Sequence, residues 1–149
     1  IAKTLDEALN LAKSSAEVTH NHPEGIKGAQ ATAAAIFLAK SGLSKDEIKT
    51  YVERTFDYDL NRKYTDIQIC YSFDVSCQGS VPESIICFLE SKDYEDAIRH
   101  AIALGGDADT MAAICGAIAA AFYGVIPESI LEHCYKLLPD DMKRILELC

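Results

Sequence analysis

The chain has 149 residues, of which 49% are hydrophobic and 25% charged, and its formal net charge is −9. This length suits one domain with a substantial core, and the composition is ordinary for a globular protein. The acidic balance argues against general nucleic-acid binding, because such a surface repels phosphate backbones. No apolar run is long enough to span a bilayer, which argues against a membrane protein.

The chain contains six cysteines, and none of them belongs to a C-x-x-C pair. Cys87, Cys115 and Cys134 lie among apolar residues at helical spacing. This pattern favours reduced, mostly buried thiols in a cytoplasmic protein over a disulfide framework. The sequence shows no signal peptide and opens at Ile1 without a methionine. We therefore expect a piece of a longer protein.

In chain order, the first predicted element follows a T-x-x-E capping box at residues 4–7, which predicts a helix over residues 5–15. After a polar loop, Pro23 fits the first turn of an alanine-rich helix that extends to about Lys40. Gly42 then ends that helix in a left-handed conformation. Because this second helix is apolar on most sides, we expect it to be central in the fold.

A second capping box at residues 44–47 predicts a helix through about Phe56. Residues 57–80 show no strong period and indicate a long loop, with a short turn of helix near residues 66–71 as an option within it. Long irregular segments of compact domains often carry function.

The remaining helices are predicted over residues 82–90, 94–104 and 110–123, followed by two that start at Pro127 and Pro139. No segment reads as a strand. The predicted fold is therefore all-α, a compact bundle of about eight helices in a single domain over residues 1–149. Gly116 lies among alanines in the most apolar helix, which predicts a close helix crossing at that position.

The most informative motif is the run from Gly105 through Gly106, Asp107, Ala108 and Asp109 to Thr110. Its two glycines allow a tight turn and the close approach of a ligand. Carboxylate and hydroxyl oxygens suit Mg²⁺ or Mn²⁺ rather than zinc. A divalent cation would also remove the repulsion between two converging carboxylates. The pattern therefore makes the two aspartates and the threonine candidate metal ligands.

A structural interpretation of the same residues stays open. Asp107 can cap the following helix, Asp109 can place a favourable charge in its first turn, and Gly105 can end the preceding helix. Residues 111–122 favour the ligand site, because a helix this apolar is expected to lie inside the protein. Its start would then open toward the interior or a cleft.

Three segments together resemble the ADP-ribosylglycohydrolase family. Residues 105–124 resemble the C-terminal metal motif of that family. Residues 15–20, followed by Gly28 and Ala29, resemble its S-x-x-x-T-H…G-A segment, and residues 80–85 resemble its S-V-P-x-A-I segment. The order and spacing of all three segments fit the family over essentially the whole chain.

The resemblance implies a compact all-α fold with two Mg²⁺ ions, or Mn²⁺ in some members, in a cleft that binds the ribose hydroxyls of ADP-ribose. Members of the family release ADP-ribose from modified arginine, serine or related acceptors, through an oxocarbenium-like state. On this basis Asp107 and Asp109 are candidate catalytic residues and, with Thr110, metal ligands. Gly105 and Gly106 are candidate substrate-binding residues.

The resemblance also implies that part of the site is missing. Family members carry an N-terminal half with a glutamate, a T-D-D-T metal motif and a Gly- and Asn-rich phosphate-binding stretch, and none of these occurs in this chain. We therefore expect the chain to supply the C-terminal half of the site and to be inactive alone. The missing half or a second copy of the chain is the expected protein partner.

Weaker candidates lie in the other two segments. His20 matches a family histidine near the bound ADP-ribose, and a loop histidine that satisfies local backbone groups is the alternative. Ser76, Gln78 and Gly79 precede the S-V-P segment and are candidates to line the ligand cleft. An ordinary polar turn accounts for these three residues equally well.

Two aromatic residues of the predicted loop, Tyr71 and Phe73, are candidates to stack on adenine, with core packing as the commoner fate. Three functions fit the sequence: a hydrolase, a protein that binds ADP-ribose without turnover, and a structural protein. The intact D-A-D-T motif argues against the structural role, because such a role does not need converging carboxylates.

Overall fold

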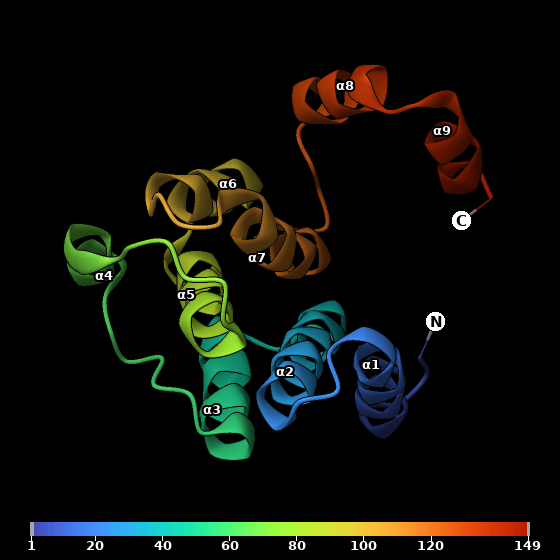
Figure 1. Ribbon diagram of the computed structural model, residues 1–149. Coiled ribbons are helices and arrows are strands. Elements are labelled where there is room, and N and C mark those ends of the chain that lie inside the picture. The colour runs from blue at the N-terminus through green and yellow to red at the C-terminus, as the bar shows by residue number, and fades with distance from the viewer. Residues whose placement is uncertain (1, 149) are drawn as a thin grey trace.

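The computed structural model describes residues 2–148, and this part of the chain contains nine α-helices and no strand (Figure 1). The helices are α1 (Leu5–Thr19), α2 (Pro23–Lys40), α3 (Lys45–Phe56), α4 (Tyr64–Cys70), α5 (Cys77–Glu90), α6 (Tyr94–Ala103), α7 (Ala108–Tyr123), α8 (Glu128–Leu137) and α9 (Asp140–Leu146). The all-α prediction is confirmed. The short α4 accounts for the difference from the expected eight, and it lies within the segment predicted as a long loop.

The start of α5 differs from the prediction. Pro82 was expected to begin this helix, but the helix begins five residues earlier, at Cys77, and contains the proline. The reason is a cap: the Ser76 side chain accepts a hydrogen bond of 3.1 Å from the backbone N–H of Gly79. This bond satisfies an otherwise orphaned donor of the first turn, so the helix starts at the serine and accommodates the proline further on.

The centre of the fold is formed by α2, α5 and α7, which contact one another (Figure 1). In α2 the residues Ala31, Ala34 and Ala35 are completely buried, so the prediction that this helix is central is confirmed. Small side chains let the neighbouring helices approach closely. They therefore bring segments that are far apart in the sequence against one another.

Gly116 lies where α7 crosses α6. A Cβ atom at this glycine would be only 2.8 Å from Cδ1 of Ile98 on α6, so the predicted close crossing is confirmed. A comparable approach occurs where α2 meets α5, since a Cβ at Gly28 would lie 3.2 Å from both Cys77 Cβ and Val81 Cγ2. Gly116 therefore permits the close approach of α7 to α6, and Gly28 permits that of α2 to α5.

Helices α8 and α9 have no buried residue. Figure 1 shows them carried away from α1–α7 by the segment after α7. They expose large apolar side chains, among them Leu131, Leu137 and Leu146. Tyr135 on α8 donates a hydrogen bond of 3.1 Å to Glu147, the residue that follows α9. Much apolar surface of this α8–α9 arm is therefore exposed.

The cysteines of the bundle and of the arm also differ in burial. Cys87 and Cys115 are buried free cysteines, as predicted, whereas Cys134 on α8 is exposed, so its predicted burial is wrong. Cys134 does lie in a helix, as its spacing predicted, but no neighbouring element buries it. Within residues 2–148, no helix has both the length and the apolar character needed to cross a bilayer.

Candidate functional site

The loop between α6 and α7 requires both of its glycines. Gly105 adopts a φ of +74°, a left-handed conformation that favours glycine. Gly106 lies against the ring of Tyr71, and a Cβ atom there would collide with Cε1 of that ring and lie 3.2 Å from Met111 Sδ. Tight packing against Tyr71 therefore fixes where the following aspartates stand.

Asp107 is the residue that precedes α7 at the N-cap position, yet its side chain makes no capping hydrogen bond. The equivalent side chains before α5 and α6, Ser76 and Asp93, both cap their helices. Aspartate is among the best capping residues. The capping interpretation of Asp107 therefore does not describe the structure, and its carboxylate is not committed to the helix.

Asp109 lies in the first turn of α7, close to Asp107. A hydrogen-bonding contact with the Asp107 side chain, together with the backbone N–H groups of Thr110 and of Asp109 itself, lowers the pKa of the Asp109 carboxyl group. Asp109 and Thr110 are exposed and Asp107 is half-buried. The structure thus brings two carboxylates together beside a hydroxyl at the protein surface.

The exposure of this helix start has a simple origin. Helix α7 buries one face, which includes Met111 and Ile118, while Ala113 and Ala117 remain exposed. The expectation that this apolar helix lies inside the protein is therefore correct for its buried face, but its start does not open into the interior. Much of the apolar character on the exposed face comes from alanine. An alanine exposes little apolar area, so it is tolerated at a surface.

The two aspartates provide only part of a metal site. Among the described residues, no group of three or more His, Cys, Asp or Glu side chains is arranged to hold a metal ion. Asp107, Asp109 and Thr110 offer hard oxygen donors, which fit Mg²⁺ or Mn²⁺ in kind, but Mg²⁺ takes about six ligands. Any metal bound here would need donors from water, substrate or another protein segment.

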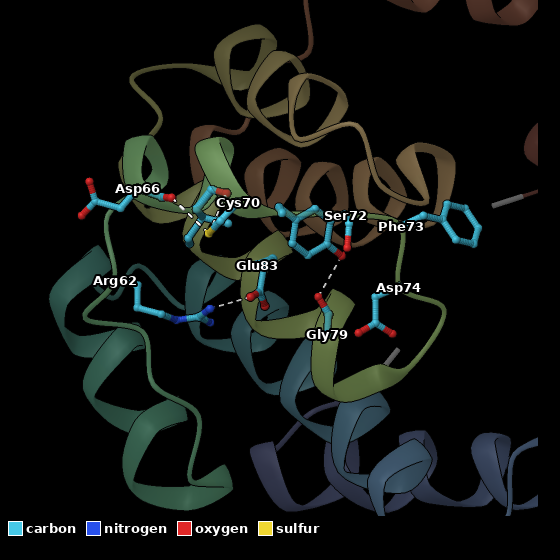
Figure 2. Close-up of a pocket in the computed structure, with 10 residues that line it drawn as sticks. Arg62, Asp66, Cys70, Ser72, Phe73, Asp74, Gly79 and Glu83 are labelled. Carbon is cyan, nitrogen blue, oxygen red and sulfur yellow. Dashed lines mark hydrogen bonds and ion pairs between the residues drawn. The ribbon is translucent and has the colours of Figure 1, made fainter.

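Tyr71 also lines a cleft of about 410 Å³, which Figure 2 shows. It is lined by Arg62, Asp66, Ile67, Cys70, Tyr71, Ser72, Phe73, Asp74, Gly79 and Glu83. The Tyr71 hydroxyl donates a hydrogen bond of 2.8 Å to the carbonyl of Gly79. Burial above all, with the nearby acids that include Asp107, raises the pKa of Tyr71 to about 12. Tyr71 therefore joins the cleft to the D-A-D-T loop.

The three candidate ligand-binding residues before the S-V-P segment have different positions in the structure. Gly79 lines the cleft, and the Asp74 carboxylate occupies the place where a side chain at Gly79 would begin. Ser76 caps α5, which is the structural interpretation, while Gln78 is exposed. Of the two aromatic candidates, Tyr71 is half-buried and Phe73 is 66% exposed, so core packing does not account for Phe73.

His20 follows α1 and is exposed, with Nδ1 lying 2.8 Å from the Thr19 hydroxyl. It lines a second groove, of about 500 Å³, together with Gly28, Cys77 and Ile114. Ile114 lies one helical turn after Thr110, so these two residues share a face of α7. The structure therefore brings His20 and the D-A-D-T motif to neighbouring positions along α7, and only His20 lines this groove.

An ion pair in the cleft was missed by the sequence interpretation. Arg62 Nη1 donates a hydrogen bond of 2.6 Å to Glu83 Oε1, and the Glu83 side chain is only 8% exposed. The two residues are 21 positions apart, so no local pattern pairs them. The available signal was a charged residue inside the apolar run of residues 81–89, where an acid must be paired if it is buried.

Comparison with known proteins adds a family to this geometry. A family model described as ADP-ribosylglycohydrolase matches residues 1–149. An uncharacterized protein of Archaeoglobus fulgidus is 34% identical over 135 residues, which cover 81% of this chain and 44% of that protein. Human ADP-ribosylhydrolase ARH3 is 41% identical over 68 residues, 37% of this chain and 19% of the human protein.

The bovine ADP-ribosylhydrolase ARH3 is 40% identical over the same length of 68 residues. No solved structure matches the chain at a significant level. The chain spans less than half the length of the curated relatives it matches, since the matched regions cover 44% of the archaeal protein and 19% of each of these two mammalian proteins.

Proposed function

Because the chain belongs to the ADP-ribosylglycohydrolase family, we propose that it supplies the C-terminal half of a metal-dependent site that releases ADP-ribose from an ADP-ribosylated acceptor. One observation carries this proposal: Asp107 stands at a helix start without capping it, beside Asp109. A carboxylate that makes neither a capping hydrogen bond nor an ion pair with the described residues is available to bind a ligand.

Within this proposal Asp107, Asp109 and Thr110 hold Mg²⁺ or Mn²⁺, two ions in the intact site, and the two aspartates act in catalysis. A metal bound there supplies electrostatic orientation of the ribose hydroxyls and of a water near the anomeric carbon. Gly105 and Gly106 let the ribose approach the backbone. His20 contacts the ligand from its neighbouring groove.

The other half of the site comes from a partner segment. The archaeal and human relatives are more than twice as long as the regions matched here. The apolar faces of the α8–α9 arm give that segment a surface to cover. The partner is therefore the N-terminal half of a family domain, and a second copy of the chain is the alternative.

The test is a titration of the chain with Mg²⁺ or Mn²⁺ and ADP-ribose, followed by NMR at the amides of residues 105–110. We expect saturable shifts that require both metal and ADP-ribose and that vanish in Asp107→Ala and Asp109→Ala. The matched control is Asp6→Ala, which removes an exposed acid from the first turn of α1. Equal shifts in all three variants would reject the site. Binding that is never accompanied by hydrolysis, even with an added N-terminal half, would favour a binding protein.

A further inference from the structure

The cleft beside Tyr71 is rich in acids. Three carboxylates line it, from Asp66, Asp74 and Glu83, against the single guanidinium of Arg62. Figure 2 shows Arg62 directed at Glu83, and Asp74 beside Gly79 on another side of the cleft. The cleft therefore carries an excess of negative charge, which favours a cationic occupant.

Glu83 in particular is only half paired. Its Oε1 accepts the hydrogen bond from Arg62, whereas its Oε2 is buried and has no hydrogen-bond partner among the described residues. The side chain is 8% exposed, and a buried carboxylate oxygen without a donor is costly. Arg62 itself is 39% exposed, so its end is able to shift and admit a second donor.

Asp74 provides a second acceptor at the same cleft. Its Oδ1 accepts a hydrogen bond of 2.7 Å from the backbone N–H of Ser76, and hydrogen bonding to Ser76 lowers the pKa of the Asp74 carboxyl group. The carboxylate is therefore ionised at neutral pH. Gly79 makes room for it, because a side chain at that position would collide with Oδ2 of Asp74.

The position of the cleft limits which part of a substrate reaches it. Tyr71 lines the cleft, and its ring also lies against Gly106, directly before Asp107. A group in the cleft would therefore be an immediate neighbour of a ribose held at the aspartates. The adenosine of ADP-ribose is separated from that ribose by two phosphates, so the acceptor polypeptide is the nearer part of the substrate. Phe73, which lines the cleft and is 66% exposed, provides apolar surface for a polypeptide.

We propose that this cleft binds an unmodified arginine or lysine side chain adjacent to the modified residue of the acceptor polypeptide, with Glu83 and Asp74 accepting its N–H donors. The proposal rests on the proposed function, because it places the ribose at Asp107 and Asp109. It adds a preference for acceptors whose modified residue has a basic neighbour.

The experiment compares two probes that differ in charge but hardly in shape, N-acetylarginine amide and N-acetylcitrulline amide, by NMR titration of the whole chain. We expect saturable shifts at the amides of Tyr71, Gly79 and Glu83 with the arginine probe and none with the citrulline probe. Asp74→Asn keeps the acceptor for the Ser76 N–H, and Glu83→Gln keeps the side-chain shape. Each should weaken binding by about tenfold.

The control variant is Asp6→Asn, which removes the same charge on α1 and should leave the affinity unchanged. Equal binding of citrulline, equal weakening by Asp6→Asn, or no saturable shift with arginine would each overturn the proposal. If Glu83→Gln lowers stability, Asp74→Asn decides alone. A parallel titration with Mg²⁺ and ADP-ribose reports the metal site separately. Arginine binding without ADP-ribose binding would reject the proposed function, and the reverse result would reject only the basic subsite.

Discussion

The bundle α1–α7 and the α8–α9 arm use similar sequence patterns with opposite results. Both contain apolar residues at helical spacing, yet α5 buries nine of its residues and α8 and α9 bury none. The difference is the presence of a partner. Helix α5 packs extensively on α2, α6 and α7, whereas the arm has no contact of comparable extent with them among the described residues. An amphipathic pattern therefore predicts that one face of a helix will be covered, but it does not identify the segment or chain that covers it.

The strongest test of this comparison is activity. As a monomer, the chain should not hydrolyse ADP-ribosyl bonds at a meaningful rate, because two carboxylates and a hydroxyl cannot alone fix a metal-bound ribose in a reactive position. The assay measures ADP-ribose released from an ADP-ribosylated protein with Mg²⁺ or Mn²⁺. Adding a family N-terminal half should restore release, and Asp107→Ala or Asp109→Ala should abolish it. Substantial release by the verified monomer would show that the catalytic groups are misplaced here.

Within the bundle, Phe88→Ala should have the largest effect on stability. Phe88 is completely buried, and its ring meets that of Phe122 edge-on at 5.3 Å. Its removal should lower the free energy of unfolding by roughly 3–5 kcal/mol, as measured by urea denaturation. The matched change Phe73→Ala, at an exposed phenylalanine, should be nearly neutral. Similar losses in the two variants would contradict the burial described for Phe88.

Gly116→Leu tests the crossing of α6 and α7. A leucine there must displace Ile98 and should cost about 1–3 kcal/mol or more through overpacking. The companion variant is Ala117→Leu, one residue further on the exposed face of α7, which should leave the thermal midpoint almost unchanged. The crossing would have to be looser than described if Gly116→Leu melted like the native chain.

Substitutions in the α8–α9 arm should have the smallest effect on stability. Leu137 is 71% exposed, so Leu137→Gln should change the stability of the bundle by less than about 0.5 kcal/mol. It should nevertheless reduce any association of the chain with itself or with an N-terminal half, because it removes apolar contact area. Sedimentation velocity and denaturation on the same sample separate the two effects. A clear loss of stability in the monomer would show that the arm packs on the bundle.

Local signals predicted much of this fold. The Ser44–Glu47 capping box is fully formed and starts α3, and Gly42 and Gly124 adopt the left-handed conformation that ends helices. The Thr4 box is formed in part: Thr4 caps Glu7, but the Glu7 side chain bonds the N–H of Lys3. Such signals act over three or four residues, so a single sequence is enough to reveal them.

The predictions that were wrong or incomplete involve competing local signals, or contacts between residues far apart in the sequence. Pro82 is a valid start signal, and the Ser76 cap overrides it. The spacing around Cys134 is helical, but burial depends on a neighbour that the spacing does not reveal. For the site, sequence placed Asp107 beside Asp109, while the pairing of Arg62 with Glu83 depends on how α5 meets the segment before α4. Side chains that converge from separate elements need the tertiary structure.

The contact between Gly106 and Tyr71 has a consequence for how the family can vary. Any side chain at the position of Gly106 would occupy space that the Tyr71 ring already fills. A larger residue at Gly106 is therefore tolerated only after Tyr71 has been replaced by a smaller residue. Relatives with a side chain at the second glycine are expected to have lost the bulky ring, and with it a residue that borders both the D-A-D-T loop and the acidic cleft.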